Sequence, residues 1–147
     1  MKKLRKKIYG CAPAHTVYLG PGRKEFHPKK PRPGIEDYIF EAGRDSLGQV
    51  ADPSAIDQGV IGNFMASRFN HQGHLAAMLP AVHETLRHKP CTRVEGACGS
   101  GGMAVATAAN AILADRADAV LVIGVEVQNT VKAIYGADIL AGAGHYS

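Results

Sequence analysis

One cysteine lies where the sequence could place a nucleophile. Cys98 belongs to the stretch VEGACGSGGMAVATAANAIL (residues 94–113), between a short apolar-led segment and a glycine-rich turn that opens into small apolar residues. A residue that ends a strand and begins a helix meets unpaired backbone N–H groups and the positive end of the helix dipole. Both favour the thiolate, which is the attacking form of cysteine. The position is therefore suited to acyl transfer.

The residues that follow Cys98 would form the rest of such a site. The N–H groups of Gly99, Ser100 and Gly101, at the start of the expected helix, could stabilise an oxyanion when a thioester is attacked. The glycines would let the backbone turn sharply and let an acyl group approach. Free cysteines are nevertheless more often small buried residues without chemistry. The spacing leaves both interpretations open.

Other motifs carry less chemistry. The stretch GSGG is not followed by the Lys-Ser/Thr pair of a phosphate-binding loop, and no GxGxxG opens a helix after the first strand. His71 and His74 are three residues apart without a third ligand spaced with them, so we expect no metal site. The spacing of Cys11, Cys91 and Cys98 is unpaired, which favours free thiols in a cytoplasmic protein.

The positive charge of the chain is concentrated at its N-terminus. The 147 residues have a formal net charge of +4, with 17 Lys and Arg against 13 Asp and Glu. Residues 1–33 hold ten of the basic side chains and one acidic one, Glu25, so this arm is +9 and the remainder is −5. Sparse aromatic residues and the prolines of PKKPRPG argue against a nucleic-acid-binding arm. No apolar run approaches the roughly 18 residues of a membrane span.

Helices and strands are expected to alternate along the chain. We divide it into a basic N-terminal strand and proline-rich loop (1–33) and a partial domain (34–147). Strands are predicted near 7–11 and over 58–64, 89–97 and 117–125, the last buried on both faces. Helices are predicted over 35–50, 75–86 with an interruption at Pro80, and 99–113. Their inward residues would be Ile35, Ile39, Ala42, Ser46 and Val50 in the first helix and Leu75, Leu79, Val82 and Leu86 in the second. This order is typical of an α/β domain with a largely parallel sheet.

The helix expected over 99–113 is apolar or small around most of its circumference. Such a helix needs cover on every side, whereas a single sheet covers only one face. The final stretch GADILAGAGHYS is rich in small residues and shows no clear strand or helix. We therefore expect a second layer from another domain, another subunit or further chain.

Three stretches together resemble a known family. The ACGSGG elbow, the following ADRADAVLVIGVEVQNT and the upstream DPSAIDQGVIGNF are similar to the N-terminal half of the thiolase superfamily, in particular its sterol-carrier-protein-like branch of acetyl-CoA acetyltransferase-like enzymes. The resemblance implies a layered α-β-α fold with a mostly parallel mixed sheet. It also implies that Cys98 takes the acyl group from an acyl-CoA as a thioester, without a tightly bound cofactor. Val94 and Glu95 would lie on the strand that meets its counterpart across a dimer axis.

The same resemblance implies a second half, with a further cysteine in a Cys-x-Gly motif and a histidine next to Gly and Pro or Asn. Neither motif is found in this sequence, where Gly144-His145 is followed by Tyr146. The leading hypothesis is a thiolase-type acyltransferase that carries out Claisen exchange with CoA as a homodimer or larger assembly, the 147 residues alone being inactive. An accessory acyl-CoA-binding subunit accompanies some relatives. One alternative is a relative of ketosynthases or hydroxymethylglutaryl-CoA synthase. Another is a non-catalytic subunit or truncated module that docks with a partner.

Overall fold

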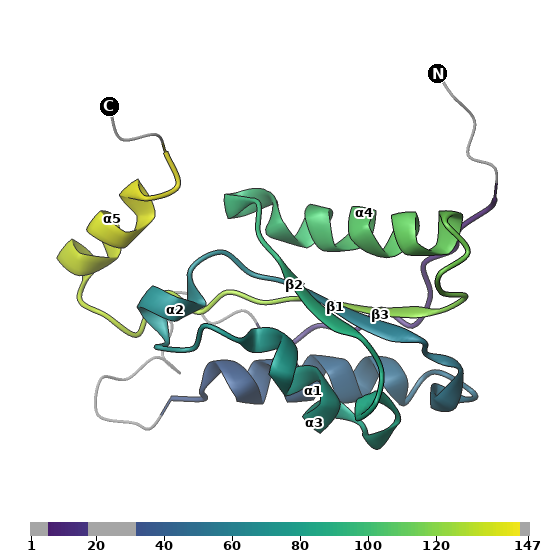
Figure 1. Cartoon of the computed structure of the whole chain (residues 1–147). Coiled ribbons are helices and arrows are strands. Elements are labelled where there is room, and N and C mark those ends of the chain that lie inside the picture. Colours follow the sequence, from purple (N-terminus) through teal and green to yellow (C-terminus); the bar gives the residue numbers. More distant parts are fainter. Residues whose placement is uncertain (1–5, 18–31, 145–147) are drawn as a thin grey trace.

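A small parallel sheet lies at the centre of the structure. The computed structural model describes residues 6–17 and 32–144. Its sheet has the order β2-β1-β3, with β1 over Gln58–Gly62, β2 over Cys91–Val94 and β3 over Val120–Gly124. Helix α4 (Ser100–Leu113) covers one face, and α1 (Ile35–Leu47) and α3 (Leu79–Val82) cover the other (Figure 1). The expected α-β-α layers are confirmed, and the strands in the described residues are parallel rather than mixed.

The strand register brings the carboxyl ends of the three strands together. Gly62, the last residue of β1, pairs with Val94 of β2 on one side and with Gly124 of β3 on the other. The carboxyl ends of all three strands therefore lie together, which is where α/β sheets usually bind ligands. β3 is not buried on both faces as expected, because Leu121 and Ile123 are buried while Val120 and Val122 are only half-buried.

The main core fills the space between the sheet and α1. Ile35, Ile39 and Leu47 are buried there, as is Gly43, where an added Cβ would lie 2.6 Å from Val82 Cγ1. The predicted set of inward residues is therefore only partly right. Ile35 and Ile39 are buried as expected, whereas Ala42, Ser46 and Val50 are only half-buried. The helix also ends three residues earlier than predicted.

The second expected helix is divided into three short ones. They are the 3-10 turns η2 (Leu75–Met78) and η3 (Glu84–Leu86) with α3 between them. All four predicted inward residues of this region are buried. Pro80 lies in the first turn of α3, where its missing N–H has no partner to lose, so it starts a helix rather than interrupting one.

The N-terminal segment is not a strand. Residues 6–17 are irregular, and Ala12 has a positive φ of 51°. The segment is held against α1 by the Ser46 hydroxyl, which donates to the Ala12 carbonyl over 2.8 Å, and by the Gln49 amide on the Pro13 carbonyl at 3.1 Å. The prediction of a strand near 7–11 is therefore wrong. Residues 1–5 and 18–31 of the basic arm lie outside the described residues, and its boundary at residue 33 stays a prediction.

Two helices were not expected from the sequence. The short α2 (Ala66–Phe69) follows β1, and α5 (Ala133–Ala141) occupies the stretch that was expected to lack an element. α5 exposes the large apolar side chains of Ile134, Tyr135 and Leu140. None of the helices in the described part of the chain is long and apolar enough to cross a membrane.

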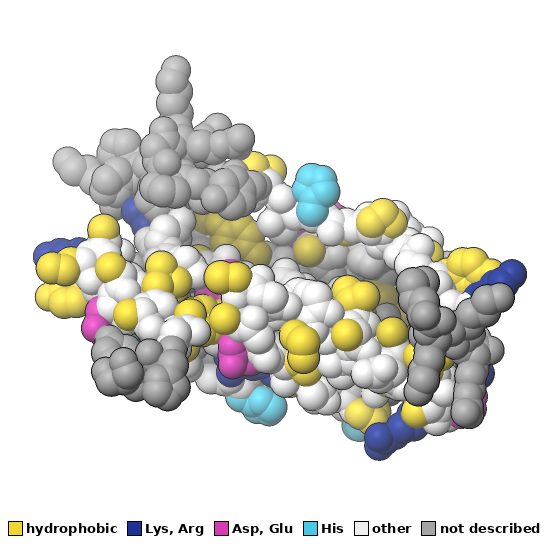
Figure 2. All heavy atoms as spheres, turned by 90° about the horizontal axis from the view of Figure 1, so that it is seen from above, with side chains coloured by type: hydrophobic (Ala, Val, Ile, Leu, Met, Phe, Trp, Pro, Cys, Tyr) yellow, Lys and Arg dark blue, Asp and Glu magenta, His cyan; other side chains and the backbone are white. Residues whose placement is uncertain are grey.

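The outer face of α4 is apolar and open. Ala104 and Ala108 are buried, whereas Met103 and Val105 are 48% and 60% exposed. Figure 2 looks onto this side of the molecule, and hydrophobic side chains are spread across it. The face that the sequence marks as needing cover is therefore uncovered by the described residues.

Candidate functional site

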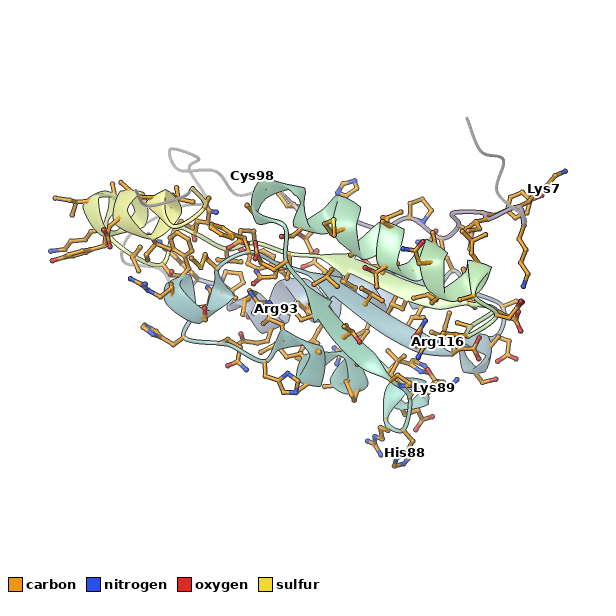
Figure 3. All side chains as sticks on the ribbon, turned by 45° about the horizontal axis from the view of Figure 1, so that its top comes forward. Lys7, His88, Lys89, Arg93, Cys98 and Arg116 are labelled. Carbon is orange, nitrogen blue, oxygen red and sulfur yellow. The ribbon has the colours of Figure 1, made fainter. Side chains whose placement is uncertain are left out.

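Cys98 lies just beyond the carboxyl edge of the sheet. β2 ends at Val94, the 3-10 turn η4 (Ala97–Gly99) follows, and α4 begins at Ser100. Figure 3 shows Cys98 at the start of α4 and Arg93 on β2 at the same end of the sheet, with Lys89 and Arg116 toward the other end. The Cys98 side chain is a free thiol and is exposed. The predicted strand–elbow–helix arrangement is therefore present, and the buried-thiol alternative is wrong.

The elbow around Cys98 is fixed by a buried serine. Ser100 is 5% exposed, and its hydroxyl donates to the Ala97 carbonyl over 2.7 Å while accepting the Gly96 N–H at 3.0 Å. Ala97 has φ 49°, a left-handed conformation that costs an L-residue about 1–2 kcal/mol. From the sequence, the N–H of Ser100 is predicted to help stabilise an oxyanion of the substrate. In the structure its side chain holds the turn that presents Cys98.

A glycine at the end of β1 lets the helix start come close to the sheet. An added Cβ on Gly62 would lie 2.4 Å from the carbonyl oxygen of Ser100 and 3.1 Å from the Gly101 nitrogen. Real side chains never approach backbone so closely, so this contact requires glycine. The close approach brings the first turn of α4 against the ends of β1 and β3.

A hollow of about 280 Å³ opens beside Cys98. Its wall comes from the ends of β1 and β3, the η4 turn and the first turn of α4, and besides Cys98 it includes Gly62, Phe64, Ala97, Gly101, Gly124 and Glu126. At Gly101 an added Cβ would meet nothing within 4 Å, so the space before it is open. Of the predicted oxyanion donors, the Gly99 N–H donates to the Gly96 carbonyl at 2.9 Å and the Ser100 N–H donates to the Ala97 carbonyl, which leaves the N–H of Gly101 in the first helical turn as the candidate. The arrangement can accommodate a small carbonyl compound next to a thiol.

A carboxylate that the sequence analysis missed also lines this hollow. Glu126 follows β3, and its Oε2 accepts the Phe64 N–H at 2.9 Å and the Asn63 side-chain amide at 3.1 Å. Burial of the carboxylate raises the pKa of Glu126, and the Phe64 N–H opposes part of that rise. Asn63 is 1% exposed, donates also to the Val125 carbonyl at 3.0 Å, and accepts the Ala66 N–H at 3.1 Å. A lone Glu after an apolar strand gave no local signal for this role.

Arg93 holds the same turn from the opposite side. Its Nη2 donates to the Phe64 carbonyl over 2.7 Å and to the Asn63 carbonyl over 3.4 Å. The Phe64 N–H thus donates to Glu126, beyond the end of β3, and the Phe64 carbonyl accepts from Arg93 of β2. The turn after β1 is connected to both neighbouring strands.

The remaining predicted site residues lie near the elbow and differ in exposure. Gly99 is exposed and ends η4, directly before α4. Val94 is half-buried at the end of β2, and the exposed Glu95 follows outside the strand. β2 is an edge strand of the three-stranded sheet, so its outer backbone groups face away from β1.

The other two cysteines do not line the hollow, and the described residues contain no candidate metal site. Within residues 6–17 and 32–144 no group of three His, Cys, Asp or Glu side chains could hold a metal ion. Cys91 is half-buried in β2, and burial raises the pKa of its thiol. Cys11 is exposed on the N-terminal segment and does not line the hollow.

The fold and the cysteine elbow agree with one protein family. Residues 39–147 match the family described as thiolase, N-terminal domain, so the chain belongs to the thiolase family through that domain. An acetyl-CoA acetyltransferase from Methanocaldococcus jannaschii is 35% identical over 112 residues, which cover 76% of this chain and 28% of that protein. An acetyl-CoA acetyltransferase from Methanothermobacter thermautotrophicus is 36% identical over 96 residues, covering 63% and 24%. The chain spans about a quarter of the length of these curated relatives.

The family resemblance stated from the sequence is thereby confirmed. The match to thiolases favours that family over the ketosynthase and hydroxymethylglutaryl-CoA synthase alternative. Assignment to the sterol-carrier-protein-like branch stays a prediction.

Proposed function

We propose that the protein is an acyl-CoA acyltransferase of the thiolase type, with Cys98 as its nucleophile. The observation that carries the proposal is the exposed Cys98 thiol on the wall of the hollow, directly before the first turn of α4. Membership of the thiolase family and the names of the two similar acetyltransferases support the reaction class.

The first chemical step is a thioester exchange. The Cys98 thiolate attacks the carbonyl carbon of acyl-CoA, and the negative charge that develops on the oxygen is stabilised at the start of α4 by the N–H of Gly101. The carbon–sulfur bond to CoA then breaks, CoA leaves as a thiolate that takes a proton from water, and the acyl group stays on Cys98. In the second step a carbon nucleophile takes the acyl group in a Claisen exchange. The resemblance places the base for that step outside this sequence.

Mass spectrometry of the intact chain tests the first step. We expect one acetyl adduct after exposure to acetyl-CoA, mapped to Cys98, with little turnover to acetoacetyl-CoA. The Cys98→Ala variant should take up no acetyl group, whereas Cys11→Ala, which removes the other exposed thiol, should react like the original chain. Normal acetylation of Cys98→Ala would reject the assignment. The assignment would also be rejected if no acetyl group were taken up and an alkylating reagent modified all three cysteines at the same slow rate.

A second candidate function is a non-catalytic module that docks with a partner. The exposed apolar side chains of Met103 and Val105 on α4 favour it, because exposed apolar surface is commonly an interaction surface. A chain that is monomeric and soluble at high concentration would count against docking, and acetylation at Cys98 would count for the enzyme.

We further propose that the complete protein is a cytoplasmic homodimer or larger assembly that contacts its partner subunit through β2, near Val94 and Glu95. β2 supports this proposal as an edge strand with backbone groups available for pairing. Light scattering measures the mass in solution, and a monomeric mass unaffected by concentration would contradict the dimer. An accessory acyl-CoA-binding subunit is a separate proposal, tested by co-purification.

A further inference from the structure

A single turn forms the wall of the hollow after β1. The turn begins at Asn63 and Phe64, both of which line the hollow together with Cys98. It receives side chains from both neighbouring strands: Arg93 from β2 and Glu126 from the residues after β3. The positions of these three segments at the carboxyl edge therefore depend on one another.

Two charged side chains contact the backbone of this turn. The Phe64 N–H donates to Glu126 over 2.9 Å, and the Phe64 carbonyl accepts from Arg93 over 2.7 Å. The peptide groups on both sides of Phe64 are thus fixed by side chains of opposite charge. Charged hydrogen bonds are stronger than neutral ones, so this arrangement restrains the orientation of the turn.

Asn63 adds a second connection to Glu126. Its buried side chain donates one N–H to Glu126 Oε2 and the other to the Val125 carbonyl, and its oxygen accepts the Ala66 N–H. With each of its polar groups bonded, the Asn63 side chain has a single orientation. Removing the Glu126 carboxylate would leave both a backbone donor and a buried side-chain donor without an acceptor.

We propose that Glu126 is a positioning residue for the acylation of Cys98. It holds Asn63 and Phe64 where they form the wall of the hollow that faces the thiol, and so fixes the space in which the acyl carbonyl is oriented for attack. This role deepens the proposed function and rests on it. Glu126 acts through the turn, and no proton transfer to the substrate is assigned to it.

The chain offers a matched control at the opposite edge of the sheet. Asp57 precedes β1, and its Oδ2 accepts the Asp118 N–H at 2.7 Å and the Ala119 N–H at 3.1 Å. Like Glu126, it joins β1 to β3 through two donors on one carboxylate oxygen. Because it lies at the amino ends of the strands, Asp57→Ala should weaken the fold without altering the wall of the hollow.

The test compares two reactions of Cys98 in the complete 147-residue chain. Acetyl-CoA needs an oriented carbonyl, whereas iodoacetamide needs only an accessible thiolate. Mass spectrometry of the peptide that contains Cys98 gives both rates at pH 8 and separates them from reaction at the exposed Cys11. We expect Glu126→Ala to lower the acetylation rate by about 10–100-fold with the alkylation rate little changed. Glu126→Gln, which keeps an acceptor oxygen, should restore most of the acetylation. Asp57→Ala should lower the melting temperature and leave the ratio of the two rates unchanged.

Several outcomes would overturn the proposal. Glu126→Ala could lower both rates in parallel, or could change their ratio no more than Asp57→Ala does. Either result would mean that Glu126 only stabilises the fold. Unchanged acetylation in a folded Glu126→Ala chain would also overturn it, while the proposed function would stand. Failure of the original chain to be acetylated by acetyl-CoA or by the smaller S-acetyl-N-acetylcysteamine would reject both proposals.

Discussion

The Ser100 carbonyl occupies the space that a side chain on Gly62 would need. An added Cβ would lie 2.4 Å from that oxygen, and the obstacle is backbone, which cannot rotate away. The end of the central strand and the start of α4 therefore meet in a contact that only glycine permits. Cys98 is two residues before Ser100, so this contact also sets the distance between the thiol and the sheet.

Replacing Gly62 should therefore change both stability and reactivity. We expect Gly62→Ala to lower the free energy of unfolding by about 1–3 kcal/mol, the usual cost of overpacking, and to slow acetylation of Cys98. Gly73→Ala is the control, because a Cβ there meets nothing within 4 Å. Urea unfolding measures the difference between them. Equal stability of the two variants would show that the α4 start can move away from β1 at no cost.

The Ser100 hydroxyl gives a second prediction. Ser100→Ala removes the acceptor of the Gly96 N–H and the donor to the Ala97 carbonyl. We expect a loss of about 1 kcal/mol in unfolding free energy, because two hydrogen bonds outweigh the better helix propensity of alanine. Thr107→Ala removes a hydroxyl bonded to the Met103 carbonyl farther along the same helix, and should cost less. Thermal unfolding followed by circular dichroism compares them. A Ser100→Ala chain as stable as Thr107→Ala would contradict a structural role for the elbow hydroxyl.

Gly101 should show opposite effects on stability and chemistry. It lies in the first turn of α4 and lines the hollow, and an added Cβ would point into open space. Gly101→Ala should raise the free energy of unfolding by up to about 1 kcal/mol, because alanine favours the helix. The same methyl group should slow acetylation of Cys98 by about tenfold, and longer acyl-CoAs more.

Gly102→Ala distinguishes these two effects. Gly102 is also in the first turn with nothing within 4 Å of an added Cβ, but it does not line the hollow. Gly102→Ala should therefore raise the free energy of unfolding without slowing the acetylation of Cys98. Similar rates for both variants would mean that the hollow is not where the acyl group lies.

The two carboxylates that join β1 to β3 should respond to pH in opposite directions. Burial raises the pKa of Glu126, so just above the ordinary carboxyl range the folded chain holds a proton that the unfolded chain has released. Rising pH therefore destabilises the original chain there relative to Glu126→Gln. The Asp118 and Ala119 N–H groups lower the pKa of Asp57, so its stabilising effect is present above the ordinary carboxyl pKa and is lost as pH falls through its lowered value.

Urea unfolding of the original chain, Glu126→Gln and Asp57→Asn at several pH values tests whether the two carboxylates change stability in opposite directions. Between about pH 3 and pH 7, Glu126→Gln should gain stability relative to the original chain and Asp57→Asn should lose it. A parallel change in both variants would show that one of the two carboxylates is in a different environment from the one described.

Local signals in the sequence predicted much of the fold. β1 and β3 were expected because each is a short apolar run bounded by turn residues, and β2 as the short segment between Pro90 and the glycine elbow. α4 was expected because small residues follow that elbow. The position of Cys98 between β2 and α4 follows from the same local pattern. By contrast, residues 7–11 have a strand-like composition but no neighbouring strand in the described structure. Strand propensity alone therefore gave a wrong prediction there.

The contacts around the hollow could not be predicted in the same way. Asn63 and Glu126 meet because β1 and β3 are neighbours, and Arg93 reaches the same turn because β2 lies on the other side of β1. Strand order depends on packing across the whole domain, and no spacing between residues 63, 93 and 126 reports it. Likewise, Gly43 faces the core because Val82 packs against it, which helical periodicity does not reveal.

The central position of β1 has a consequence for how the chain folds. β1 precedes both of its partners, so Val60 and Ile61, which are buried in the sheet, emerge from the ribosome before any strand can pair with them. Pairing with β3 must wait until Gly124 has been made, and such distant contacts form slowly. During synthesis this apolar strand therefore needs protection from aggregation.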